Sequence, residues 1–370
     1  MRTTANELAL FLREPARLAT ATLAEWDRLV PMARFAGLLG RLAFLAEECG
    51  GLEMVPPAVR PHLQAAKVLA EKHRRDTLYN VARLTDLLTP VLGRVILLKG
   101  AAYLCADLPP ANGRIFNDID ILVPRRVLPN VESILTIGGW RLGEITPYDE
   151  SYYRRWMHQI PPLMDGVRGC CVDVHHTIVP LTARVTLGAD ELLGQVVALP
   201  NHSHLAVLSP PDMVLHSAVH LFHEGEFGRG LRDLDDMNRL LRQFGATPGF
   251  WQTLLRRAEV LDLSRALFYA LRYAASLLGT PVPEDVLRAA AARAPIAPAL
   301  GIMDTAFARA LRSQHPDCAD WLTGAALELL YIRAHYLRMP LHLLVMHLSR
   351  KALMRLTAAA SDDAKVQEAR

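Results

Sequence analysis

The sequence predicts a mixed α+β fold, in which a core built on a β-sheet lies between two helical regions. Apolar residues recur at helical spacing toward both ends of the chain. From Gly93 to about Pro200 the pattern changes to short β-rich runs interleaved with helical stretches. We therefore expect four parts: a helical N-terminal region over residues 1–90, the core over 91–205, a helical C-terminal domain over 206–358 and a polar, disordered tail over 359–370.

Two pairs of breaker residues divide the N-terminal region. Gly50-Gly51 and Pro56-Pro57 separate a helical pattern over residues 27–48 from a longer one over residues 59–88. A shorter apolar pattern over residues 7–18 comes before both. We expect a helix for each pattern, with a loop at the breakers.

Short β-rich runs define the core. Helical stretches lie between some of them, over residues 101–108 and 128–138. A turn at Asp165–Gly169 is typical of a hairpin and comes just before the last run. The expected strands are residues 94–100, 118–123, 140–145, 160–164 and 170–179, and the later helical patterns are 210–224, 231–244, 248–279 and 321–358.

Composition restricts the class of protein. The chain has 370 residues, 51% of them hydrophobic and 21% charged, which is enough for two or three hydrophobic cores. A net charge of +3 and an aromatic content of 6% predict no extensive nucleic-acid surface. The five cysteines are odd in number and form no Cys-x-x-Cys pair, and no signal peptide or long uncharged run is present. These features predict a cytoplasmic protein.

Two aspartates on one predicted strand are the main candidate site residues. Asp118 and Asp120 are two residues apart, so strand alternation projects both from the same face. A third acid, Asp173, lies on a later predicted strand together with His175. If the two strands are neighbours, the three carboxylates could hold two divalent cations about 4 Å apart, with Mg²⁺ or Mn²⁺ as the expected ions.

A turn before the acidic strand is a candidate phosphate site. Lys99 and Gly100 follow an apolar strand and open a helix, so the amides near Gly100 and Ala101 could face an anion. Lys99 would add a positive charge, or would form an ion pair with one of the acids. Arg114 could clamp a phosphate with two hydrogen bonds, or could neutralise the acid cluster.

The chain resembles a known family in the order of these motifs. The motifs in question are LLKGAAY, Arg114, NDIDILVP and VDVHHTI, followed by LSPPDMVLHSAVHLFHE and LRDLDDMNRLL. In this order they resemble the uncharacterised nucleotidyltransferase family of the DNA polymerase β-like nucleotidyltransferase superfamily. The resemblance covers roughly Asp27 to Leu241. It implies a nucleotidyltransferase-type mixed sheet and metal roles for Asp118, Asp120 and Asp173. The superfamily binds nucleotide phosphate at a Gly-Ser, whereas this chain has Lys99-Gly100.

The implied activity is transfer of a nucleoside monophosphate from an NTP, ATP among the candidates, to an acceptor hydroxyl or other nucleophile. The acceptor could be a small molecule, a sugar, a tRNA end or a protein. One alternative is a catalytically silent nucleotide-binding or regulatory module on the same fold.

A row of histidines supports another alternative, a His/Asp metallohydrolase. His216, His220 and His223 fall at i, i+4 and i+7 and therefore share one helix face. Polar residues that could join them follow shortly after: Arg232, Asp233, Asp235 and Asp236. The competing interpretation is a helix face packed on the core, with His220 and His223 near a substrate cleft. His175 could orient Asp173, contact substrate, or be a hydrogen-bonded strand residue.

A basic, apolar stretch over residues 330–356 has the composition of an amphipathic helix at a bilayer surface. It predicts either weak peripheral membrane contact or a terminal helix packed on the body of the protein, with its arginines extended toward water.

Overall fold

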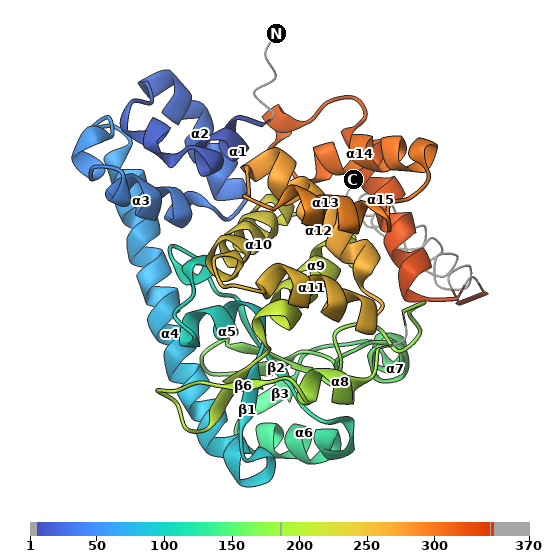
Figure 1. The fold of residues 1–370 in the computed structure, drawn as a ribbon. Helices are drawn as coiled ribbons and strands as arrows, with labels where there is room; N and C mark the ends of the chain where they lie inside the picture. The colour runs from blue at the N-terminus through green and yellow to red at the C-terminus, as the bar shows by residue number, and fades with distance from the viewer. Residues whose placement is uncertain (1–5, 186, 341, 344–370) are drawn as a thin grey trace, which may run out of the picture.

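A computed structural model describes residues 6–185, 187–340, 342 and 343, and it confirms the mixed α+β fold (Figure 1). In these residues, fifteen α-helices accompany one seven-stranded mixed sheet. The helical patterns predicted over residues 59–88, 210–224 and 231–244 each form one helix, whereas those over 27–48 and 248–279 are each divided into two helices. The middle of the chain forms the sheet, and most of the N-terminal and C-terminal helices lie to one side of it (Figure 1).

The N-terminal helices pack on one another and on the core. Helix α2 begins with a capping box, in which the Thr22 hydroxyl accepts a hydrogen bond from the Glu25 amide and the Glu25 carboxylate accepts one from the Thr22 amide. Helix α3 packs along the long helix α4. The bounds are α1 Glu7–Arg13, α2 Leu23–Phe35, α3 Leu39–Glu48 and α4 Arg60–Leu92.

The sheet has the strand order β3-β4-β5-β2-β1-β7-β6. Strand β2 is parallel to β5 and antiparallel to β1, while β1 is parallel to β7. The turn after Asp165 joins β4 to β5 as the predicted hairpin. The strands are β1 Val95–Leu97, β2 Asp118–Leu122, β3 Trp140–Leu142, β4 Leu163–Asp165, β5 Cys171–His175, β6 Val197–Ala198 and β7 Leu205–Val207.

Strands β6 and β7 were not predicted. Strand β7 has only three residues and is followed almost at once by the apolar pattern of a helix, so its alternation is too short to detect. It pairs with β1, and the expected boundary between residues 205 and 206 falls inside it.

Helices of the N-terminal region and of the core both pack against the sheet. Helix α4 contacts β1, and α6 (Leu128–Ile137) contacts β3 as well as α4. Helix α5 (Lys99–Cys105) follows β1 and reaches the C-terminal helices, where the Tyr103 and Ser217 hydroxyls are 2.7 Å apart. This contact links the strand-helix turn at Lys99 to the helical domain.

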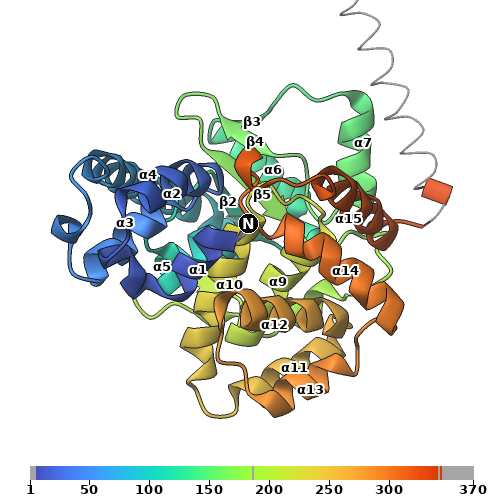
Figure 2. The same ribbon diagram turned by 90° about the horizontal axis from the view of Figure 1, so that it is seen from above.

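Helix α9 (Pro210–His223) is central to the C-terminal helices, and it packs on α10, α11 and α12. Helix α7 was not predicted, since it has no apolar stripe; the Thr146 hydroxyl caps its first turn by accepting a hydrogen bond from the Asp149 amide. Both views place α7 beside α15 (Figures 1 and 2). The remaining bounds are α7 Pro147–Trp156, α8 Ala189–Leu193, α10 Gly230–Gly245, α11 Phe250–Val260, α12 Ser264–Leu278, α13 Glu284–Ala291, α14 Ala297–Ala310 and α15 Thr323–Arg338.

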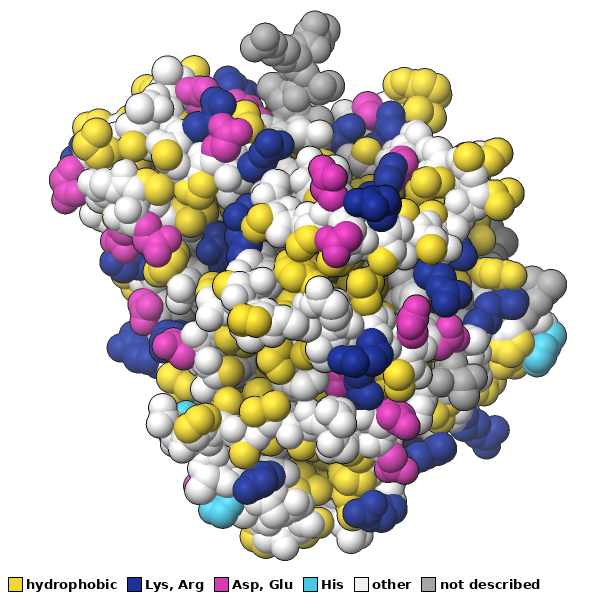
Figure 3. Space-filling model, in the orientation of Figure 1, with side chains coloured by type: hydrophobic (Ala, Val, Ile, Leu, Met, Phe, Trp, Pro, Cys, Tyr) yellow, Lys and Arg dark blue, Asp and Glu magenta, His cyan; other side chains and the backbone are white. Residues whose placement is uncertain are grey.

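Basic and acidic side chains are intermixed on the face shown in Figure 3, without a continuous basic patch. Among the described residues, no helix is both long and apolar enough to cross a membrane. Most of the stretch predicted to be amphipathic, residues 330–356, and the whole tail predicted to be disordered, residues 359–370, lie outside the described residues.

Candidate active site

The three predicted acids lie on one face of the sheet. In the parallel pair of β2 and β5, Asp120 is directly opposite Asp173, and Asp118 is opposite Cys171. All three carboxylates line one cleft of about 680 Å³. Local alternation placed Asp118 and Asp120 on this face, and the register of β5 brought Asp173 to it.

Asp120 is the buried centre of the group. Its side chain is 4% exposed, and its Oδ1 accepts hydrogen bonds from Lys99 Nζ at 3.1 Å and from His175 Nε2 at 2.9 Å. Burial alone would raise the pKa of Asp120, but the Lys99 ammonium and the His175 ring together outweigh burial and hold that pKa far below its usual range. Asp120 is therefore ionised at neutral pH.

The other two acids have raised pKa values. Burial, followed by the charges of Asp120 and Asp118, raises the pKa of Asp173 to about 7. Burial and the Asp120 charge raise the pKa of Asp118 as well. Like charges at close range disfavour ionisation of one another. A cation placed among these carboxylates would relieve that repulsion.

One group of side chains in the described residues has the spacing of a metal site. Asp120, Asp173 and His175 each offer a ligand atom, and these atoms lie within 4.8 Å of one another. The two carboxylates suit Mg²⁺ or Mn²⁺, whereas the imidazole is a ligand more typical of transition metals such as Zn²⁺ or Fe²⁺. Asp118 stands outside this tight group but lines the same cleft. The donor set therefore fits a divalent cation.

The Lys99 turn has the predicted position between β1 and α5 and a strained backbone. Lys99 has a φ of 44°, in the left-handed region that non-glycine residues rarely adopt. This conformation accompanies the ion pair with Asp120. At Gly100, an added Cβ would lie 3.2 Å from both Arg114 Nε and Phe116 Cδ1, so these two side chains cover the turn.

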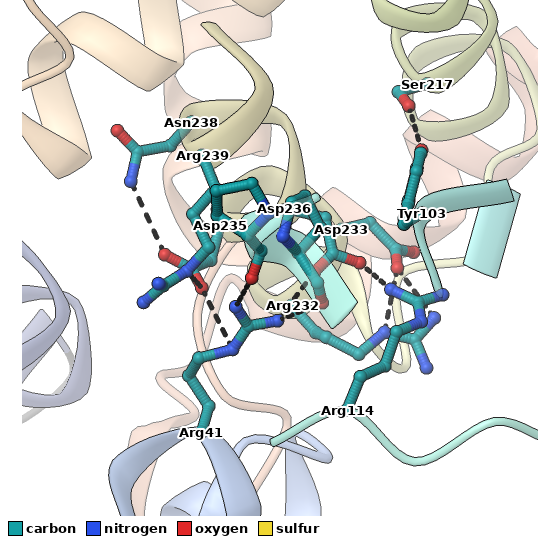
Figure 4. Close-up of polar contacts among 12 residues, drawn as sticks. Arg41, Tyr103, Arg114, Ser217, Arg232, Asp233, Asp235, Asp236, Asn238 and Arg239 are labelled. Carbon is teal, nitrogen blue, oxygen red and sulfur yellow. Dashed lines mark hydrogen bonds and ion pairs between the residues drawn. The ribbon is translucent and has the colours of Figure 1, made fainter. Parts of the chain in front are cut away.

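Arg114 contacts an acid from the helical domain, Asp236 of α10, in an ion pair. Its side chain is 10% exposed and still lines the cleft. Arg41 of α3 shares the same carboxylate, with Nη2 donating to Asp236 Oδ1 at 3.0 Å. Figure 4 shows Arg41 and Arg114 on either side of the α10 acids. Burial and nearby Arg232 lower the pKa of Arg114 to about 10.

The three histidines of α9 have separate environments. His216 is buried, with its ring centroid 6.3 Å from that of His175. His220 lines the cleft, and its Nδ1 is 2.6 Å from Glu224 Oε2. His223 is buried away from the cleft wall, and burial followed by Arg333 lowers its pKa to about 3. The metal-capable group of the described residues includes none of the three.

Several cleft residues were not singled out from the sequence. Helix α7, helix α15 and the segment before β4 supply most of them, because these elements meet at the cleft only in the folded chain. The Thr146 cap of α7 and the helical pattern predicted over residues 321–358, which contains α15, are the local signals. These additional residues include Tyr152, Tyr153, His158, Gln159, Glu224 and Tyr331.

Comparison with known proteins gives one match. Residues 22–279 match a family described as uncharacterised nucleotidyltransferase, and this span includes the sheet, the acids and α10. No curated protein and no solved structure matches the chain. The match covers well over half of the 370 residues. The chain belongs to the uncharacterised nucleotidyltransferase family.

Proposed function

We propose that this protein is a metal-dependent nucleotidyltransferase that moves a nucleoside monophosphate from an NTP to an acceptor nucleophile. The observation that carries the proposal is the parallel register of β2 and β5, which sets Asp173 opposite Asp120 on the face that Asp118 shares. Membership of the family supports an NTP as the substrate.

Asp118, Asp120 and Asp173 would hold Mg²⁺ or Mn²⁺, with two ions expected. When bound, these ions would lower the pKa of the acceptor and neutralise charge on the leaving pyrophosphate. In the transfer, a bond forms between the acceptor oxygen and the α-phosphorus, and the bond from that phosphorus to the bridging oxygen breaks. Asp173, on β5, would accept the acceptor's proton.

The basic side chains would orient the nucleotide. Arg114 and Lys99 line the same cleft as the acids. Lys99 holds Asp120 in place through its ion pair, and Arg114 has a planar guanidinium suited to phosphate oxygens. The amides near Gly100 and Ala101 would contribute hydrogen bonds to the phosphates, and Gly100 lies against Arg114, where an added Cβ would be 3.2 Å from Nε.

A second candidate is a catalytically silent nucleotide-binding module. The Lys99 ion pair with Asp120 favours it, because a buried ammonium supplies part of the charge that a metal would otherwise supply. This candidate predicts NTP binding without pyrophosphate release.

The test is incubation with each labelled NTP and Mg²⁺ or Mn²⁺, following pyrophosphate release and label transfer. The variants are Asp118→Asn, Asp120→Asn and Asp173→Asn. The matched control is Asp86→Asn, an exposed position on α4. We expect each cleft variant to lose about 100-fold or more in turnover, and the control to lose nothing. Undiminished turnover by Asp120→Asn would refute the proposed mechanism, and NTP binding without turnover by the native protein would favour the silent module.

A further inference from the structure

A second, smaller cavity of about 140 Å³ lies beside Asp118. Three arginines line it: Arg114 from the loop before β2, and Arg229 and Arg232 from the start of α10. Asp118, Arg114 and Arg232 also line the main cleft, so the two cavities adjoin at the acids. Arginines from two parts of the chain, far apart in sequence, therefore face one small space next to the candidate metal ligands.

The side chains of Arg229 and Arg232 both pack on the turn between α2 and α3. Gly37, in the turn between α2 and α3, has a φ of 69° and no side chain. A Cβ at Gly37 would lie 3.8 Å from Cδ of Arg229 and 3.8 Å from Cδ of Arg232. Both aliphatic stems thus rest on this turn. Arg232 is fixed further by Asp233, which accepts hydrogen bonds from Nε at 2.9 Å and Nη2 at 2.6 Å.

Guanidinium groups outnumber carboxylates in the lining of the cavity, although Asp236 and Asp233, outside the lining, pair with Arg114 and Arg232. One donor in the lining has no partner. Asp118 is the only acid among its lining residues, against three guanidinium groups. Arg232 lowers the pKa of both Arg114 and Arg229, after burial, because the three cations repel one another. In the described structure, Arg114 Nε is buried and has no hydrogen-bond partner. An anion would satisfy this donor and offset the repulsion.

We propose that Arg114, Arg229 and Arg232 form the subsite for the β- and γ-phosphates of the NTP, and for pyrophosphate after transfer. This inference rests on the proposed function and identifies where the leaving group is held. It places the phosphates at the Gly100 end of the turn, against the arginines, and not at Lys99, because Gly100 lines the cavity and Lys99 is paired with Asp120. Guanidinium groups bind phosphate oxygens with paired, charge-assisted hydrogen bonds.

The position of this subsite also orients the reaction. In a phosphoryl-type transfer, the attacking and leaving oxygens lie roughly in line across the phosphorus. With the terminal phosphates at α10 and the Arg114 loop, the acceptor must approach from the Asp173 side. The cleft on that side is bounded by Met164 of β4 and by Tyr152 and Tyr153 of α7.

The experiment measures binding by calorimetry, with the full chain, Mg²⁺ and no acceptor. The probes are inorganic pyrophosphate, ATP and AMP. The test variant is Arg229→Gln, because Arg229 is an exposed residue whose loss does not threaten folding. Arg126→Gln, exposed and outside both cavities, removes the same charge and is the matched control. Arg229→Lys keeps the charge without the paired donors.

For Arg229→Gln we expect pyrophosphate and ATP to bind about tenfold more weakly, AMP to bind as in the native protein, and Arg229→Lys to recover part of the loss. Each of four results would overturn the subsite. Two concern pyrophosphate directly: the native protein binds none, or Arg229→Gln binds it as tightly as the native protein does. The other two are losses of affinity equal to the expected one, either for AMP in Arg229→Gln or for pyrophosphate in Arg126→Gln. If Arg229→Gln loses pyrophosphate affinity while the native protein, incubated with NTP and Mg²⁺ or Mn²⁺, releases no pyrophosphate and transfers no label, the subsite stands and the proposed function fails. If the native protein transfers label while Arg229→Gln binds pyrophosphate as tightly as the native protein does, the proposed function stands and the subsite fails.

Discussion

Replacing Arg41 with methionine tests whether the N-terminal helices support the candidate active site. Arg41 is 1% exposed on α3 and donates hydrogen bonds to the carbonyls of Pro109 and Pro110 at 3.0 and 2.6 Å. It also donates to Asp236, which pairs with Arg114 through its other oxygen. Arg41 therefore anchors both the loop that leads to Arg114 and the carboxylate that holds it (Figure 4).

The loss of stability expected for Arg41→Met follows from these contacts. At 3.0 Å the attraction between Arg41 and Asp236 is about 5.5 kcal/mol at an effective dielectric constant of about 20, before the cost of desolvation. Breaking a buried pair typically costs about 3–5 kcal/mol. Arg41 Nε also lies 3.7 Å from Asp235 Oδ2. Each of the two acids keeps a second arginine, Asp236 with Arg114 and Asp235 with Arg239, so we expect the lower end, about 3 kcal/mol.

Thermal unfolding converts this value into a measurement. An unfolding entropy of about 2.1 cal/mol/K per residue amounts to about 0.8 kcal/mol/K for the chain, so Arg41→Met should lower Tm by about 4 °C. Arg41→Lys should recover only part of this, since one ammonium cannot reach both carbonyls and the carboxylate.

The control is Arg17→Met, which removes a salt bridge between side chains that are 53% and 42% exposed. It should change Tm by about 1 °C or less. The affinity for ATP should fall in Arg41→Met, because the Arg114 loop loses its anchor. An Arg41→Met protein with native Tm and native ATP affinity would refute the reasoning.

Three further predictions concern the metal, pH and packing. Mn²⁺ at about a hundred times its dissociation constant should stabilise the native protein by about 2.7 kcal/mol and raise Tm by about 3 °C, with no rise in Asp120→Asn; equal shifts would count against the site. The pKa of His223 is about 3 in the folded chain and near 6.5 when unfolded, so its contribution to stability is complete above pH 6.5 and is lost as pH falls toward 3. At pH 5 the loss is about 2 kcal/mol, and urea midpoints should depend less on pH in His223→Gln; an unchanged dependence would contradict the assignment. Gly40→Ala places a Cβ 2.5 Å from the Gly113 carbonyl oxygen, so it should lower the free energy of unfolding, measured in urea, by about 1–3 kcal/mol. If the position were open, replacing a helical glycine with alanine would instead raise the free energy of unfolding, and that result would contradict the prediction.

Local patterns predicted much of the architecture. The helical spacing at both ends, the strand at Asp118–Leu122 and the hairpin after Asp165 all follow from neighbours along the chain. Helices α7 and α8 and strands β6 and β7 were missed. Helix α7 has no apolar stripe, and α8, β6 and β7 have too few residues for a periodic pattern to show.

The candidate site shows the same division. The two-residue spacing of Asp118 and Asp120 by itself determined that they share a face, because successive strand residues alternate sides. Only the tertiary structure decided that Asp173 lies opposite Asp120, that Lys99 pairs with Asp120, and that Arg229 and Arg232 face Asp118. Strand register and helix docking depend on burying apolar surface between distant segments, and local periodicity carries no information about which segments meet.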